Sequence, residues 1–293
     1  MTNALKRMMK TNETNPFLKH FPVHLGEAIY SWLNYISYTS DSNVLAESSV
    51  RYPLAEFIER RLQKPVTLEF NHPCVPQPPT GHKRCIDFVF SKIGENIVNA
   101  KKNEIGEERV YIELKYVSKS YKDSNEIQRV FNDLVRLALV STETNECYFI
   151  LCGGNEDFCQ FVKGSPEVEN GSDGPKLKQY IGNETQEEIR SDYAKWLYLE
   201  KTEENEAIMT ILTDSNSVKS IKGKKNYTKG FDKEYNHKKD KSRVKNPVKI
   251  PKTICTELVY IRDSSGVSRK MMVAIWKVWW AKSEEENNDQ KAT

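Results

Sequence analysis

The segment between residues 109 and 154 constrains the fold most, because an apolar strand, an amphipathic helix and a second apolar strand follow one another there. The runs "RVYIELKYV" (109–117) and "CYFILCGG" (147–154) have the composition of buried strands. The helix "DSNEIQRVFNDLVRLALV" (123–140), with Asp123 or Ser124 as its N-cap, carries one apolar face formed by Ile127, Val130, Phe131, Leu134 and Ala138. We therefore predict a strand-helix-strand unit within a sheet.

Further elements are expected on both sides of this unit. The patterns predict helices over 24–36 and 43–62, the second kinked at Pro53, and strands over 66–70 and 84–90 that enclose a Pro-rich loop. A hairpin around "DSSG" is expected in residues 256–280. The predicted class is α/β, with a central four-stranded mixed sheet flanked by helices, a C-terminal hairpin and a basic insertion.

The chain is expected to form one domain over residues 22–281, with its core at about 43–154. Residues 1–21 are predicted to be weakly ordered and residues 282–293 to be a disordered tail. Residues 155–250 show little apolar periodicity apart from a helical pattern at 186–201. The basic insertion, about 215–252, is expected to be flexible.

Composition limits where the protein can reside. The longest apolar run, "MMVAIWKVWWA", is short and is interrupted by Lys277, and the first residues contain no apolar stretch long enough for a secretory signal. We therefore expect a cytoplasmic protein that does not enter a membrane. The six cysteines show no spacing typical of a small disulfide-bonded scaffold.

The net charge of +3 conceals an uneven distribution. Residues 219–252 contain 13 Lys and Arg but only three acidic residues. Aromatic residues lie among these lysines, among them Tyr227, Phe231 and Tyr235, a composition suited to phosphate contact and base stacking. A solvated, lysine-rich loop is the alternative interpretation.

Charged residues inside two of the expected strands suggest a site. Side chains alternate between the faces of a strand, so Asp87 shares a face with Val89, and Glu113 shares one with Tyr111 and Lys115. If the two strands pair with these faces aligned, the two carboxylates and the lysine converge. A hard cation such as Mg²⁺ would relieve the repulsion between the carboxylates. The simpler alternative is a solvated ion pair on a strand surface.

These residues resemble the PD-(D/E)xK nuclease superfamily, which has the restriction-endonuclease-like fold. "IDF" (86–88) and "IELK" (112–115) carry the resemblance, which covers about residues 43–154, with the C-terminal hairpin as a candidate addition, and does not cover residues 155–250. Ile86 replaces the proline of the family pattern. The resemblance implies a phosphodiesterase that depends on Mg²⁺, with Mn²⁺ as an alternative, and acts on nucleic acid, DNA more than RNA.

The resemblance also implies roles for individual residues. Asp87 and Glu113 would bind the metal together with the backbone carbonyl of Leu114, and Lys115 would be the catalytic lysine. A further glutamate is expected from the first core helix, with Glu47 as first choice and Glu56 as second.

Several other side chains are candidates for nucleic-acid contact. They are Arg51, Gln128 and Arg136 on the helices and Lys224, Lys225, Lys238 and Lys239 in the basic segment. Arg51 lies one turn from Glu47 and would position that carboxylate, contact DNA or form a surface ion pair. For Arg136, a solvated pair with Asp133 is an equal alternative.

A zinc site is a minor alternative in the Pro-rich region. His72, Cys74, His82 and Cys85 have suitable side chains, but their HxC and HxxC spacings are irregular. A connecting loop is the preferred interpretation.

Three functional hypotheses remain open from the sequence. The first is a DNA endonuclease of restriction, phage-defence or repair type. The second is a nuclease-fold subunit that binds nucleic acid or a partner without cutting, and the third is an unrelated α/β enzyme acting on small phosphates. "CGGN" (152–155) lacks the lysine and spacing of a phosphate-binding loop, which weighs against the third. Both a homodimer and a complex with another subunit are compatible with the sequence.

Overall fold

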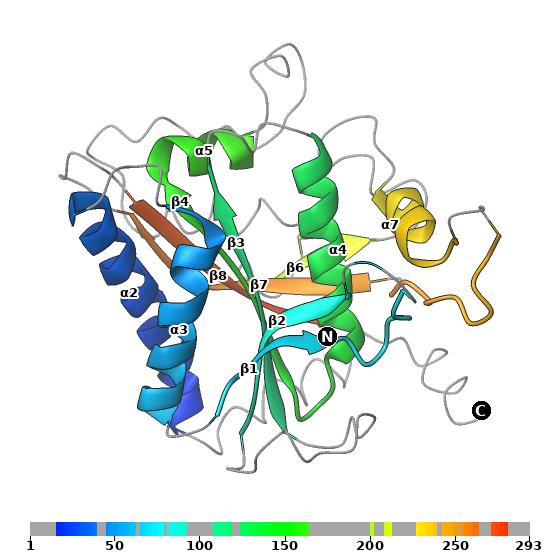
Figure 1. Ribbon diagram of the computed structural model, residues 1–293, viewed down its shortest axis with the longest axis horizontal. Helices are drawn as coiled ribbons and strands as arrows, with labels where there is room; N and C mark the ends of the chain where they lie inside the picture. Colours follow the sequence, from blue (N-terminus) through cyan, green and yellow to red (C-terminus); the bar gives the residue numbers. More distant parts are fainter. Residues whose placement is uncertain are drawn as a thin grey trace.

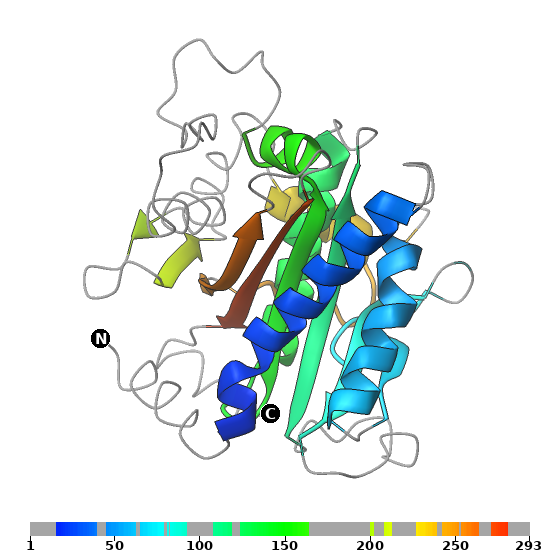
Figure 2. The same ribbon diagram turned by 90° about the vertical axis from the view of Figure 1, so that its left-hand side faces the viewer.

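One mixed β-sheet organises the protein. The computed structural model describes residues 16–39, 45–62, 65–78, 81, 83–92, 108–118, 124–163, 200–201, 208–212, 227–238, 242–251, 253–263 and 271–280. Within these residues the sheet has eight strands, in the order β1-β2-β3-β4-β8-β7-β6-β5. Figures 1 and 2 show helices on both of its faces.

The sheet contains one parallel pair among antiparallel ones. β1 (Thr67–Asn71), β2 (Cys85–Ser91) and β3 (Arg109–Val117) are antiparallel neighbours, and β4 (Glu146–Gly154) runs parallel to β3. The helix α4 (Ser124–Val140) provides the crossover that a parallel pair requires. The predicted strand-helix-strand unit is therefore confirmed.

The C-terminal half of the chain extends the same sheet. β7 (Thr253–Asp263) and β8 (Met271–Trp280) form the expected hairpin, and β8 pairs with β4. β6 (Ile208–Leu212) and β5 (Glu200–Lys201) continue beyond β7. The sheet is thus mixed, as predicted, but it is larger than the expected four strands.

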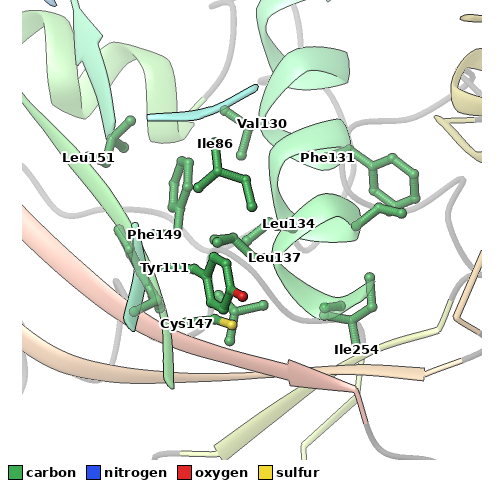
Figure 3. Close-up of a cluster of buried hydrophobic side chains, with 14 of the residues drawn as sticks. Ile86, Tyr111, Val130, Phe131, Leu134, Leu137, Cys147, Phe149, Leu151 and Ile254 are labelled. Atoms are coloured by element: carbon green, nitrogen blue, oxygen red, sulfur yellow. The ribbon is translucent and has the colours of Figure 1, made fainter. Parts of the chain in front are cut away.

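Each face of the sheet has its own hydrophobic core. The helices α2 (Pro16–Thr39) and α3 (Glu47–Leu62) cover one face (Figure 2). The other face packs against α4, α5 (Asn155–Lys163) and α7 (Tyr227–Tyr235). Figure 3 shows Leu134 and Leu137 of α4 beside Tyr111, Cys147 and Phe149 from the sheet. α3 and α4 therefore hold β2 and β3 from opposite sides.

A tryptophan from another helix replaces the hydrogen bond that the proline within α3 cannot donate. Pro53 has no N–H to donate to the carbonyl of Ser49, which lies four residues before it. The indole Nε1 of Trp32 in α2 donates to that carbonyl instead, at 2.9 Å. α3 consequently continues through Pro53 from Glu47 to Leu62, while the contact joins the two helices.

Several expectations about ordered segments need correction. α2 begins at Pro16, and Phe21 is buried against Phe90, so residues 16–21 belong to the folded part. The sequence predicted neither α5 nor α7. Phe231 and Tyr235 of α7 are buried, so their rings serve the core and are not available for base stacking. Residues 1–15 and 282–293 lie outside the described residues, as does the expected helix at 186–201 except for the last two residues, which form β5.

Among the described helices, none combines the length and the apolar character that a membrane crossing requires.

Candidate active site

The site lies where β2 and β3 stop pairing. Their register aligns Phe88 with Ile112 and Val89 with Tyr111. The next position would align Asp87 with Glu113, and the ladder ends there. The Oδ2 atom of Asp87 accepts a hydrogen bond from the backbone N–H of Leu114 at 2.8 Å. A side chain of β2 thus satisfies a backbone donor of β3 that the sheet leaves unpaired.

The two strand carboxylates are close neighbours in a buried place. The register of β2 and β3 brings Asp87 and Glu113 to facing positions, and only 3% of the Glu113 side chain is exposed. Burial raises the pKa of Glu113 well above its ordinary value, Arg136 opposes this, and the charge of Asp87 raises the pKa further. Burial likewise raises the pKa of Asp87, against the effects of Arg51 and of the Leu114 N–H. A cation between these two groups would favour their charged forms.

Side chains of α4 complete one half of the site. Arg136 donates to Oε1 of Glu113 from both Nε (3.1 Å) and Nη2 (2.7 Å). It also donates to Asp133 at 2.8 Å and to the hydroxyl of Tyr235 at 3.0 Å. The Nζ of Lys115 lies 3.9 Å from Oδ2 of Asp133. The predicted pair of Asp133 and Arg136 therefore exists, but it is buried at the site and is not solvated.

Side chains of α3 and β1 complete the other half. The Nη2 of Arg51 donates to Oε1 of Glu47 at 2.7 Å and to Oδ1 of Asp87 at 2.6 Å, and its Nη1 donates to Oε1 of Glu69 at 3.0 Å. Burial raises the pKa of Glu47, and the positive charge of Lys115 lowers it. Glu47, Asp87 and Lys115 thus belong to one electrostatic cluster. Of the roles considered for Arg51, the structure matches the positioning of Glu47, and it adds contacts with two further carboxylates.

Two residues at the site, Glu69 and Tyr235, were not predicted from the sequence. The pairing of Leu68 with Phe88 and of Phe70 with Ile86 places Glu69 opposite Asp87. Glu69 has a φ of 51°, a left-handed backbone conformation that costs an ordinary residue about 1–2 kcal/mol. Antiparallel pairing of the two expected strands could have revealed Glu69.

Tyr235 could not be found in this way, because it follows Arg136 by 99 residues. Its ring stacks on Phe231, with 4.2 Å between the ring centroids, and the guanidinium of Arg84 covers it at 4.4 Å. α7 therefore fixes a hydroxyl group beside Arg136.

The oxygen donors at the site suit a hard divalent cation. Asp87 and Glu113 would hold it from adjacent strands, Glu47 would contribute from α3, and the Leu114 carbonyl remains a predicted ligand. Among the described residues, no group of three or more His, Cys, Asp and Glu side chains is arranged to hold a metal ion. The donor type therefore fits Mg²⁺, while the third carboxylate, Glu47, is bound to Arg51.

Other candidate residues lie away from this centre or outside the described residues. Glu56 forms an exposed ion pair with Arg60 and does not join the cluster. Gln128 donates to Asn132 at 2.8 Å. Lys238 is exposed, and its backbone N–H donates to the carbonyl of Ser242. Lys224, Lys225 and Lys239 lie outside the described residues.

The structure argues against the minor zinc hypothesis, because His72 is not free to bind a metal. Nδ1 of His72 accepts the N–H of Cys74 at 3.1 Å, so Nε2 carries the proton and donates to the carbonyl of Arg136 at 2.9 Å. Burial lowers the pKa of His72 to about 4. Both ring nitrogens are used, and His72 is a neutral residue of the core that supports the backbone at Arg136. His82 lies outside the described residues.

Comparison with protein-family models, with curated proteins and with solved structures finds no match for this chain.

Proposed function

We propose that the protein is a Mg²⁺-dependent nuclease that hydrolyses phosphodiester bonds in DNA. The observation that carries this proposal is the register of β2 and β3, which brings Asp87 and Glu113 to facing positions, with Lys115 on the face of β3 that Glu113 occupies. Two buried carboxylates this close are costly to ionise unless a cation joins them. Buried acids with raised pKa values in such a cluster are typical of functional sites.

The fold is consistent with the resemblance seen in the sequence. We infer that β1 to β4 correspond to the four-stranded mixed core of the restriction-endonuclease-like fold, with α3 and α4 on its two faces. In this assignment α3 supplies Glu47, as the resemblance implies. β8, β7, β6 and β5 would then be additions at the β4 edge of the core.

The bound metal would polarise the scissile phosphate and lower the pKa of an attacking water. Asp87, Glu113 and Glu47 would hold it through carboxylate oxygens. Lys115 would place its ammonium group beside the phosphate and stabilise the negative charge that develops as the water oxygen bonds to phosphorus and the bridging P–O bond breaks. Asp133 would keep the Lys115 side chain on this side of the strand.

Cleavage of plasmid DNA with Mg²⁺ or Mn²⁺ tests this proposal. Lys115→Met keeps the aliphatic stem and removes the charge, and it should lower the cleavage rate about 100-fold or more. Lys83→Met, at an exposed position four residues before Asp87, is the matched control and should cleave normally. Equal cleavage by both variants, or no metal-dependent cleavage by the wild type on any DNA tested, would refute the proposal.

A second candidate is a nuclease-fold subunit that binds DNA without cutting it. The observation in its favour is that an arginine already pairs with each strand carboxylate, Arg51 with Asp87 and Arg136 with Glu113. Such a protein would bind DNA in a salt-sensitive manner that is independent of divalent metal. Cleavage that disappears in Lys115→Met would exclude it.

A further inference from the structure

The guanidinium of Arg51 lies among carboxylates that belong to the proposed metal site. In the described part of the protein, this side chain donates hydrogen bonds to three carboxylates, those of Glu47, Glu69 and Asp87. We propose that Arg51 occupies the cation position of the metal-free site and is displaced when a divalent metal binds. This inference rests on the proposed function and concerns how the same site is controlled.

The geometry around one nitrogen atom carries the inference. Oε1 of Glu47 and Oδ1 of Asp87 lie 2.7 Å and 2.6 Å from the same atom, Nη2 of Arg51. Divalent metals bind carboxylate oxygens at about 2.0–2.6 Å. The two oxygens therefore already surround a single positive centre at nearly the distance that a metal would need, and Nη2 and a metal ion cannot occupy this place together.

The remaining contacts of Arg51 permit it to move. Its third partner, Glu69, lies on the edge strand β1 with 68% of the side chain exposed. Its Nε is buried, and none of the described residues forms a hydrogen bond with it. The hydrogen bonds described for the guanidinium are all ionic, so a doubly charged ion that replaces it at Glu47 and Asp87 can compensate for the two that are lost. Glu69 would keep the displaced side chain at the rim of the site.

The second arginine is held differently. Arg136 bonds Glu113, but it is also fixed by Asp133, on its own helix, and by the Tyr235 hydroxyl from α7. Neither of these two partners is among the predicted metal ligands. We therefore assign the exchange with metal to Arg51, while Arg136 stays to orient Glu113.

Calorimetric titration of the full-length protein with Mn²⁺ in the absence of DNA tests the exchange. Arg51→Ala should bind Mn²⁺ about tenfold or more tightly than the wild type, the scale on which one neighbouring charge changes cation binding to a carboxylate. Arg51→Lys, which keeps the charge but cannot bridge several carboxylates, should lie between them. Arg60→Ala removes an exposed arginine from the same helix and should match the wild type.

A second measurement needs no destabilising change. In ¹⁵N NMR spectra of the wild type, the Arg51 Nε–H signal is identified by its loss in Arg51→Lys, and Ca²⁺ is added as a cation that need not support cleavage. Displacement predicts that this signal shifts with the same midpoint as Ca²⁺ binding. An unchanged signal at saturating Ca²⁺ would overturn the exchange.

The outcomes separate the two proposals. Weaker Mn²⁺ binding by Arg51→Ala, beside a wild type that cleaves DNA with Mg²⁺, would mean that Arg51 organises the ligands for the metal, and the inference would fail while the function stands. Absence of cation binding in the wild type and in every variant would overturn both. Tighter binding by Arg51→Ala without any cleavage would support the exchange and refute only the nuclease.

Discussion

Asp87 satisfies the backbone N–H of Leu114 at the point where β2 and β3 separate. The side chain thus has a structural role in addition to any catalytic one, because Leu114 is buried and an unpaired backbone N–H is costly in a buried place. The two roles can be separated by substitution.

Asp87→Asn keeps an oxygen that can accept the Leu114 N–H, whereas Asp87→Ala does not. We expect the alanine variant to be less stable than the asparagine variant by about 1–3 kcal/mol in urea unfolding, the cost of an unpaired buried donor. Both variants should lose metal-dependent cleavage. Equal stability of the two would show that the hydrogen bond to Leu114 is not needed.

Two glutamates of α3 provide a matched pair for the metal site. Glu47→Gln should lower the affinity for Mn²⁺ about tenfold or more, because it removes one carboxylate charge from the cluster of Asp87 and Lys115. Glu56→Gln changes the same residue type on the same helix, at an exposed ion pair with Arg60, and should bind Mn²⁺ as the wild type does. Calorimetry measures both, and a similar affinity in both variants would remove Glu47 from the site.

His72 should make the fold sensitive to acid. Its pKa is lowered to about 4 in the folded protein, so between the unfolded pKa of about 6.5 and pH 4 the unfolded chain binds the extra proton. The stability contributed by neutral His72 is therefore complete above pH 6.5 and is lost as the pH falls, by about 3 kcal/mol in total.

Comparison with His72→Gln isolates this effect from the buried acids. The free energy of unfolding of the wild type should fall more steeply than that of the variant between pH 6.5 and pH 4. Urea unfolding at several pH values measures both slopes, and parallel curves would contradict the role assigned to His72.

Phe231 should contribute as much to the stability of the fold as a residue of the central core does, although it lies in a lysine-rich segment. Phe231→Ala should lower the free energy of unfolding by about 3–5 kcal/mol, because the side chain is fully buried beside Tyr235 and α4. Lys238→Ala, three residues after α7 and exposed, should change it by no more than about 0.5 kcal/mol. A small effect of Phe231→Ala would instead support the flexible loop that the composition of this segment suggested.

Local sequence patterns were sufficient to predict most of the central strands and helices. β3 was predicted with its observed bounds, and the helix around Leu134 was predicted to within one residue, because each has a strong periodicity of its own. α7 was missed because its buried core residues, Phe231 and Tyr235, stand among lysines and form no long apolar pattern.

The residues of the candidate site also fall into two groups, those that local sequence patterns predict and those that they do not. Face alternation predicted Asp87, Glu113 and Lys115 on one side of the sheet on the condition that the two strands pair with these faces aligned, and the observed register meets that condition. Glu69 needed the strand register, and the ion pairs of Arg51 and Arg136 needed the packing of α3 and α4. These contacts depend on tertiary structure, which periodicity does not encode.

The strand order has a consequence for synthesis. β8, at residues 271–280, lies between β4 and β7, in the interior of the sheet. While the ribosome is still adding residues before 271, β4 has an unprotected edge and the sheet that supports Asp87 and Glu113 is incomplete. The acidic cluster should therefore reach its final arrangement only after residues 271–280 have emerged from the ribosome.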